Sequence, residues 1–252
     1  MNKHRLVAHR GDNTNYPENS YPGIKAALEM GALYIEFDVQ MNTDGTLMVL
    51  HDSDLIRTAN LNQSIFDVTD EQISSISIHE PDRFKNQHYP TPLSTLSETM
   101  ELIEQFPSAT TFVEIKEESL NRFGLENVMD ILVDNLKNKK SNIVIISFSY
   151  EAIEYAQKKV NSDKSKTTNQ NLQTGWVFER YNSENHQRAL NLQPQYLFCN
   201  YKEILNDSVL SPWKGPWKWA VYTINDIEIA KRILKKNIDL VETNDISLLM
   251  NA

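Results

Sequence analysis

The chain has 252 residues, 40% of them apolar, and its 34 acidic and 25 basic residues give a formal charge of −9. An α/β barrel commonly forms one domain of about 250 residues, so the length does not require two domains. The net charge argues against a protein that binds nucleic acid or another extended polyanion, although local cations in a cleft still allow a small anionic substrate.

The single cysteine, Cys199, excludes an intramolecular disulfide and indicates a reducing compartment. Residues 1–5 are basic, but only three apolar residues precede His9, too few for the apolar segment of a signal peptide. No run approaches the roughly 18 apolar residues of a membrane span. We therefore expect a cytoplasmic protein that does not cross a membrane.

Strand-like and helix-like segments alternate along almost the whole chain. Short apolar runs predict buried strands around residue 7 and at 33–39, 111–115, 143–146, 174–178, 195–199, 219–223 and 238–241. Apolar residues at helical spacing predict helices over 19–30, 96–106, 125–138, 150–159, 184–192, from 202, 226–236 and 245–250. Residues 161–171 are polar and predict a connecting loop.

Eight strand–helix units in one chain of this length predict an α/β fold, the closed (β/α)8 TIM barrel. An open, doubly wound sheet is the competing architecture. A turn at Asp44-Gly45 leads to a further apolar run at 47–50, which we interpret as a hairpin extension of the second strand. Residues 53–94 are polar and lack a strong strand, so we expect a single domain over 1–252 with 53–94 as a small insertion after the second barrel strand.

Acidic side chains lie near the ends of two predicted strands. Glu36 and Asp38 are two residues apart and leave the same face of their strand, and Glu114 ends the next barrel strand. Carboxylates gathered there repel one another and lose hydration, and a divalent cation such as Mg²⁺ or Ca²⁺ relieves both costs. The alternative is that these acids are exposed or paired with Arg10 and Lys116.

Two histidines, His9 and His51, also follow apolar runs. A lone histidine in such a place is more often structural, but a pair beside a metal site indicates catalysis. Cleavage of a phosphodiester needs a base for the nucleophile and an acid for the leaving oxygen, and imidazole titrates in the right range. Asp52 either orients His51 or caps the following segment.

The cations Arg10 and Lys116 can neutralise the non-bridging oxygens of a phosphate as charge develops in the transition state. Glu18 lies either beside these cations or merely at a helix start, where Asn19 or Ser20 is the N-cap. Together with the acids and histidines, these residues indicate metal-assisted attack on a phosphate ester.

The order and spacing of these motifs resemble the glycerophosphodiester phosphodiesterases. The matching motifs of the first half are His9-Arg10-Gly11, Pro17-Glu18-Asn19-Ser20, Gly31-Ala32, Glu36-x-Asp38, Thr43-Asp44-Gly45, His51-Asp52 and Glu114-Ile115-Lys116. Further on, Ser147-Phe148, Tyr222-Thr223-Ile224-Asn225-Asp226 and Thr243-Asn244-Asp245 resemble the later strand ends of that family. The likeness covers nearly the whole chain.

The resemblance implies a (β/α)8 barrel with an insertion after the second strand, and hydrolysis of glycerophosphodiesters to an alcohol and sn-glycerol 3-phosphate. It implies a divalent metal, Mg²⁺ or Ca²⁺ with Mn²⁺ as a further candidate. The roles that it implies are metal binding by Glu36, Asp38 and Glu114, acid–base catalysis by His9 and His51, phosphate contact by Arg10 and Lys116, and support by Glu18 and Asp52.

Two positions depart from the family pattern, and both are expected near the rim that meets the alcohol group. Tyr222 stands where the family usually has Trp, and Glu242-Thr243-Asn244-Asp245 replaces a Thr-Asp ending. The preferred alcohol therefore stays open, as does the choice between monomer and homodimer.

Two other functions are compatible with the same motifs. A lysophospholipase D would use this site with an apolar surface, which Trp213, Trp217 and Trp219 would supply if they did not serve core packing. A barrel that binds a phosphodiester without turnover is the non-enzymatic alternative.

Overall fold

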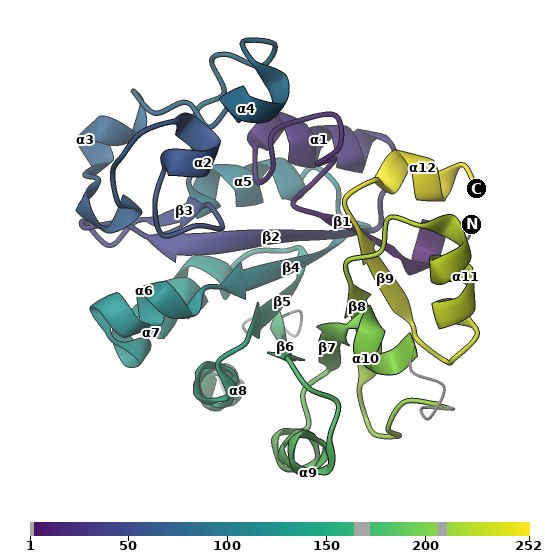
Figure 1. The fold of residues 1–252 in the computed structure, drawn as a ribbon. Coiled ribbons are helices and arrows are strands. Elements are labelled where there is room, and N and C mark those ends of the chain that lie inside the picture. The colour runs from purple at the N-terminus through teal and green to yellow at the C-terminus, as the bar shows by residue number, and fades with distance from the viewer. Residues whose placement is uncertain (1–2, 164–171, 206–210) are drawn as a thin grey trace.

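The structure, a computed structural model, describes residues 3–163, 172–205 and 211–252. Among these residues, parallel strands form a closed barrel, because β1 pairs with both β2 and β9. The barrel strands are β1 (Leu6–His9), β2 (Tyr34–Met41), β4 (Thr110–Ile115), β5 (Asn142–Ser147), β6 (Leu172–Phe178), β7 (Tyr196–Asn200), β8 (Lys218–Tyr222) and β9 (Leu240–Thr243) (Figure 1). The predicted TIM barrel is confirmed, and the open sheet is excluded.

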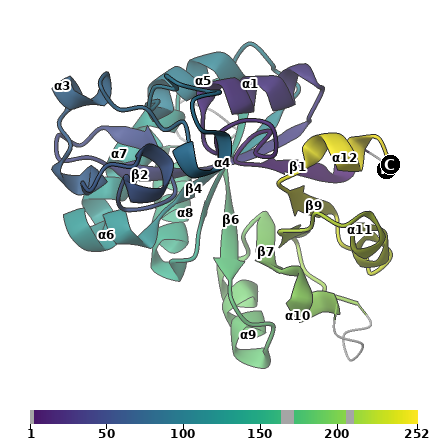
Figure 2. The same cartoon turned by 45° about the horizontal axis from the view of Figure 1, so that its top comes forward.

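Helices surround this barrel (Figure 2). They are α1 (Tyr21–Glu29), α5 (Leu96–Ile103), α6 (Glu117–Phe123), α7 (Leu125–Leu136), α8 (Tyr150–Asp163), α9 (Ser183–Leu192), α10 (Tyr201–Leu205), α11 (Ile227–Leu234) and α12 (Ile246–Met250). A 3₁₀ turn, η1 (Lys3–Arg5), precedes β1. Among the described helices, none is both long and apolar enough to cross a membrane.

The strands bury side chains on both faces, because one face lines the barrel and the other packs against the helices. The inner face contributes an apolar cluster of Val7, Phe112, Val144, Ile146, Val177, Tyr196, Phe198, Ala220 and Leu240. In this cluster the rings of Tyr196 and Phe198 each lie 5.0 Å from the ring of Phe112, in edge-to-face contact. The interior is therefore packed, and a binding site can form only where polar residues replace this layer.

The segment between β2 and α5 begins with β3 (Leu47–Val49), which pairs antiparallel with β2 as the predicted hairpin extension. Short helices follow, α2 (Ile56–Ala59), η2 (Ile65–Asp67), α3 (Asp70–Ile73) and α4 (Pro81–Phe84). Figure 1 shows α2 and α3 toward the carboxyl end of β2, and α4 at the top of the view near α1. They enclose an apolar cluster of their own, which includes Leu50, Leu55, Ile65, Ile78 and Leu93. That residues 53–94 are an insertion within one domain stays a prediction.

Some boundaries differ from those that the sequence predicts. Helix α6 is additional, and Gly124, at φ +86°, separates it from α7. Strand β9 begins later than predicted and continues to Thr243, which carries the last strand further toward the site described below. Of the predicted loop over 161–171, residues 161–163 belong to α8 and 164–171 lie outside the described residues.

Candidate active site

Polar side chains gather at the carboxyl ends of β1, β2, β4 and β9, the end at which TIM barrels carry their active sites. The parallel register brings them together, because His9 pairs with Glu36 and Asp38 pairs with Glu114. The pocket that opens there is lined by His9, Arg10, Asp38, His51, Glu114, Lys116, Ile146, Phe148, Val177, Phe198, Tyr222, Thr223 and Glu242. The structure thus places both predicted histidines, both predicted cations and two of the three predicted metal ligands along one pocket.

The three predicted metal ligands are neighbours. Carboxylate oxygens of Glu36, Asp38 and Glu114 all lie within 4.8 Å of one another. Asn19 makes two hydrogen bonds with Asp38. Nδ2 of Asn19 donates to Oδ2 of Asp38 (2.9 Å), and Oδ1 of Asn19 accepts from the backbone N–H of Asp38 (3.2 Å). These hydrogen bonds satisfy part of the hydrogen-bonding capacity of the buried Asp38 carboxylate and fix its orientation.

Glu36 differs from its neighbours because one of its oxygens is unsatisfied. Its Oε2 accepts from the backbone N–H of Arg10 (3.1 Å), whereas the buried Oε1 has no hydrogen-bond partner among the described residues. An unpaired buried carboxylate oxygen is costly, so it indicates a missing ligand. The cluster could hold a metal ion, and the all-oxygen set suits a hard divalent cation.

The cations Arg10 and Lys116 contact the same acids. Nε of Arg10 lies 3.0 Å from Oδ2 of Asp38, and Nζ of Lys116 lies 2.7 Å from Oε1 of Glu114 and 3.4 Å from Oδ1 of Asp38. The pairing that the sequence left as an alternative to metal binding is therefore present. It does not reach Oε1 of Glu36.

The balance of charge also leaves room for a cation. The described residues of the cluster include a fourth buried acid, Glu242, so four carboxylates face two cations. Burial, together with the neighbouring acids, raises the pKa of Glu36 and that of Glu242 well above the ordinary value. Burial acts in the same direction on Asp38, but Arg10 and Lys116 outweigh it and hold its pKa below the usual range. A divalent ion would supply the two missing positive charges.

His9 is held at both ring nitrogens. Its Nδ1 donates to Oδ1 of Asn244 at 2.5 Å, and its Nε2 lies 3.3 Å from Oε1 of Glu242 and 3.8 Å from Oε2 of Glu36. Burial lowers the pKa of His9 to about 4, and Arg10 acts in the same direction. The imidazole is therefore neutral near pH 7.

His51 lies across the pocket and is paired with its neighbour. Nδ1 of His51 lies 2.7 Å from Oδ1 of Asp52, and this hydrogen bond holds the pKa of Asp52 below its ordinary value. The following helix α2 has Leu55 as its N-cap residue, without a capping side chain. Of the two roles considered for Asp52, the geometry favours orienting His51.

Glu18 stands beside the phosphate-binding candidates, as its functional interpretation requires. Its Oε1 accepts from Nη1 of Arg10 (2.9 Å), and Arg57 contacts both of its oxygens (2.7 and 2.9 Å). The N-cap of α1 is Ser20, whose hydroxyl oxygen accepts from the backbone N–H of Gly23. Glu18 is thus free of a capping role.

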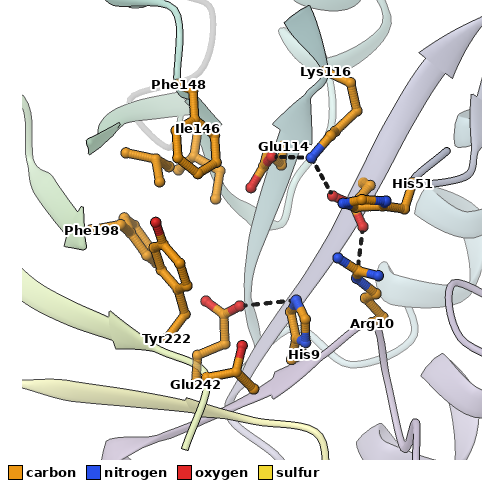
Figure 3. A pocket seen from close by; sticks show the side chains of 13 residues that line it. His9, Arg10, His51, Glu114, Lys116, Ile146, Phe148, Phe198, Tyr222 and Glu242 are labelled. Carbon is orange, nitrogen blue, oxygen red and sulfur yellow. Dashed lines mark hydrogen bonds and ion pairs between the residues drawn. The ribbon is translucent and has the colours of Figure 1, made fainter. Parts of the chain in front are cut away.

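Figure 3 shows a charged and an apolar side of the pocket. His9, Arg10, His51 and Lys116 lie opposite Ile146, Phe148, Phe198 and Tyr222. The rings of Phe148 and Tyr222 meet edge to face at 6.2 Å. The pocket can therefore hold an anionic group against its charged side while it packs carbon atoms against the other.

Four residues of this site have no catalytic, metal-binding or phosphate-binding role in the prediction from the sequence: Asn19, Arg57, Glu242 and Asn244. Glu242 and Asn244 carry the signal used elsewhere, a polar residue at the end of an apolar strand. Asn19 is part of a motif that resembles the family, but the only role predicted for it is that of a helix cap. Arg57 lies in a polar segment without periodicity, and nothing local to it indicates a contact with Glu18.

Comparison with known proteins gives a consistent picture. Residues 9–248 match the glycerophosphoryl diester phosphodiesterase family. A glycerophosphodiester phosphodiesterase from Caldanaerobacter subterraneus subsp. tengcongensis is 29% identical over 250 residues, which cover 98% of this chain and 96% of that protein.

Solved structures share the fold over the same length. A phosphodiesterase from Oleispira antarctica, solved with its product sn-glycerol-3-phosphate, has a TM-score of 0.78 at 21% identity and covers 98% of this chain and 95% of its own. A glycerophosphodiester phosphodiesterase from Thermotoga maritima has a TM-score of 0.70 at 25% identity, with coverage of 98% and 96%. The predicted enzyme class is confirmed, and the chain belongs to the glycerophosphoryl diester phosphodiesterase family.

Proposed function

We propose that this chain hydrolyses glycerophosphodiesters to an alcohol and sn-glycerol 3-phosphate, with a divalent metal at Glu36, Asp38 and Glu114 and with His9 and His51 as the acid–base pair. The observation that carries the proposal is the buried, unpartnered Oε1 of Glu36 within an acidic cluster that has more carboxylates than cations. The product bound to the Oleispira antarctica phosphodiesterase supports the assignment of sn-glycerol 3-phosphate.

The three acids would hold the metal, and a bound divalent cation supplies charge stabilisation to a phosphoryl oxygen as a Lewis acid. Mg²⁺ and Ca²⁺ are the expected ions, and Mn²⁺ is a further candidate, because all three accept oxygen ligands. Arg10 and Lys116 line the same pocket and would contact the non-bridging phosphate oxygens. Their pairs with Asp38 and Glu114 hold both cations beside the proposed metal ligands.

The histidines divide the proton transfers between them. Each has its Nδ1 engaged, by Asn244 in one case and by Asp52 in the other, so we assign the proton exchange to Nε2, which in His9 also lies 3.3 Å from Oε1 of Glu242. One imidazole removes a proton from the nucleophile, and the other donates a proton to the leaving oxygen. The nucleophile is either water or the neighbouring hydroxyl of the glycerol, the second route passing through a cyclic phosphate that ³¹P NMR would detect.

The lysophospholipase D alternative depends on the tryptophans, and their surroundings favour packing. Trp217 and Trp219 are buried, and Trp213 stacks on Tyr181 with ring centroids 4.1 Å apart. None of the three is among the residues that line the pocket. A glycerophosphodiester without an acyl chain is therefore the substrate that this site favours.

The test is release of sn-glycerol 3-phosphate from a panel of glycerophosphodiesters, with lysophosphatidylcholine as the comparison, in the presence of Mg²⁺, Ca²⁺, Mn²⁺ or excess chelator. We expect chelator to abolish turnover and metal to restore it, and His9→Ala and His51→Ala each to lose at least about 100-fold in turnover. Full activity in chelator, or wild-type rates in both histidine variants, would contradict the proposal. Binding without product release would support the non-enzymatic alternative.

The cytoplasmic location and the choice between monomer and homodimer stay predictions. Fractionation of cells that express the chain tests the first, and analytical ultracentrifugation tests the second.

A further inference from the structure

We propose that Arg57, on helix α2 of the segment between β2 and α5, is a positioning residue that fixes the orientation of both His51 and Arg10 in the site. This inference rests on the proposed function, because it assigns a task to Arg57 through two residues of that site. It follows from two carboxylates that a single guanidinium holds at once.

The first carboxylate is Asp52. Nε of Arg57 donates to Oδ2 of Asp52 (2.8 Å) and Nη2 donates to Oδ1 (3.0 Å). The same Oδ1 lies 2.7 Å from Nδ1 of His51. A two-point fork fixes the carboxylate in a plane, and the carboxylate in turn fixes the ring, so Nε2 of His51 is aimed away from Asp52.

The second carboxylate is Glu18, whose buried oxygens accept from Nη1 (2.9 Å) and Nη2 (2.7 Å) of Arg57. Oε1 of Glu18 also accepts from Nη1 of Arg10 (2.9 Å), and Nε of Arg10 lies 3.0 Å from Asp38. The guanidinium of Arg10 is thus held between two carboxylates. If Arg57 were absent, Glu18 would lose the only other cation that contacts it among the described residues, and its hold on Arg10 would change.

A purely structural role for Arg57 is the competing explanation, because the same region contains further ion pairs. Oε1 of Glu80 lies 3.4 Å from Nη1 of Arg57, and Oε2 of Glu80 lies 2.6 Å from Nη1 of Arg83. The same Nη1 of Arg83 donates to Oδ1 of Asn13 (2.8 Å). Arg83 therefore connects the same segment to the loop after β1, and among the described residues it forms no hydrogen bond or ion pair with Asp52 or Glu18. It provides a matched control for the loss of an arginine from this ion-pair cluster.

The exposure of Arg57 allows the substitution to be tested in a folded protein. Its side chain is 44% exposed, so truncation leaves no cavity in the core. Arg57→Lys keeps the positive charge but cannot make paired hydrogen bonds to both Asp52 and Glu18, because an ammonium group lacks the planar set of donors. The pair of variants thus separates charge from geometry.

The experiment measures kcat and KM for release of sn-glycerol 3-phosphate from glycerophosphocholine by the full chain at saturating Mg²⁺. We expect Arg57→Ala to lower kcat by about 10- to 100-fold, an effect of the size that follows removal of a residue that orients a metal ligand. KM should rise because Arg10 is held less firmly. Arg57→Lys should recover little of kcat. Arg83→Ala should keep kcat within about twofold of wild type, even if both alanine variants lower the unfolding midpoint.

Two further readouts distinguish positioning from folding. Asp52→Asn and Arg57→Ala should be non-additive in kcat, because both act on His51 through one path. Added guanidinium at millimolar concentration should restore part of the rate of Arg57→Ala and leave Arg83→Ala unchanged. The proposal is overturned by wild-type kcat in Arg57→Ala, by full recovery in Arg57→Lys, or by additive effects of the two substitutions. His51→Ala is measured in parallel. If the proposed function is wrong, His51→Ala keeps the wild-type rate, and this result distinguishes that failure from a failure of the role proposed for Arg57.

Discussion

The backbone at the end of β1 decides where Arg10 points. Arg10 has φ +57° and Gly11 has φ +84°, so two successive residues adopt the left-handed region. A Cβ on Gly11 would lie 2.7 Å from both the carbonyl carbon of Gly23 and the backbone nitrogen of Ile24. Only glycine lets the start of α1 approach the strand end this closely.

We therefore predict that Gly11→Ala lowers the free energy of unfolding by about 3 kcal/mol, through backbone strain together with the clash. Activity should fall as well, since the substitution displaces Arg10. Gly45→Ala is the matched control, because Gly45 has φ +85° but only an ordinary contact with Ile131 at 3.8 Å. Urea unfolding of both variants tests this, and equal destabilisation would show that the close approach is not the cause.

At the scale of elements, ion pairs join the segment of α2 and α4 to the start of α1. Glu18, just before α1, contacts Arg57 of α2, and Glu80 accepts from the backbone N–H of Glu18 at 3.3 Å. Burial opposes ionisation of Glu18, but Arg57 and Arg10 outweigh it, so its pKa in the folded protein lies below the ordinary value. The association of these elements is therefore sensitive to acid.

The sign of this effect follows from linkage. A carboxyl whose folded pKa is lowered contributes stability that is present above its unfolded pKa, about 4.3, and is lost as pH falls through the folded pKa. We predict that Glu18→Gln destabilises the chain at pH 7 and that the difference from wild type shrinks as pH falls below about 4. Asp134→Asn, in an exposed pair with Lys137, should change stability by less than about 1 kcal/mol throughout. Chemical unfolding at several pH values measures both, and a difference that grows in acid would refute the argument.

Elements whose apolar residues form a continuous run or recur at helical spacing were predicted from the sequence, and elements without such a pattern were not. Strands β1, β2 and β4 have continuous apolar runs, and helices α1, α5 and α7 have apolar residues at helical spacing, so the places of these elements could be predicted directly. The short helices around Arg57 and Glu80 are stabilised by ion pairs and by a cluster assembled from distant residues. The predicted site residues are those that end such strands, whereas Arg57 depends on contacts 39 positions apart in the sequence.

At the scale of the whole molecule, the charge of the site connects metal binding to stability. Buried acids such as Glu36, whose pKa is raised, are an unfavourable feature of the metal-free fold. A ligand that binds only the folded chain stabilises it by about 2.7 kcal/mol when its concentration is a hundred times its dissociation constant. Metal binding should therefore be visible without any assay of turnover.

We predict that saturating Mg²⁺ or Ca²⁺ raises the melting temperature by about 5–10 °C, from the usual conversion for a chain of this size. Glu36→Gln should abolish this increase and leave the metal-free protein at least as stable as wild type, since it removes a buried charge. Glu126→Gln, on the exposed start of α7, is the control and should respond to metal as wild type does. An equal increase in Glu36→Gln would place the ion elsewhere.

The barrel closes by joining its first strand to its last, so His9 of β1 meets Asn244 just after β9, a separation of 235 positions. During synthesis on the ribosome, the nascent polypeptide therefore carries His9, a proposed acid–base residue, without Asn244 until β9 and the residue after it have emerged from the exit tunnel. Until then the barrel lacks the strand that carries the pocket residue Glu242, so we expect the incomplete chain to be inactive. We therefore expect activity only after β1 has paired with β9 and closed the barrel. Two separately expressed halves of the chain would regain activity only if they restored this pairing.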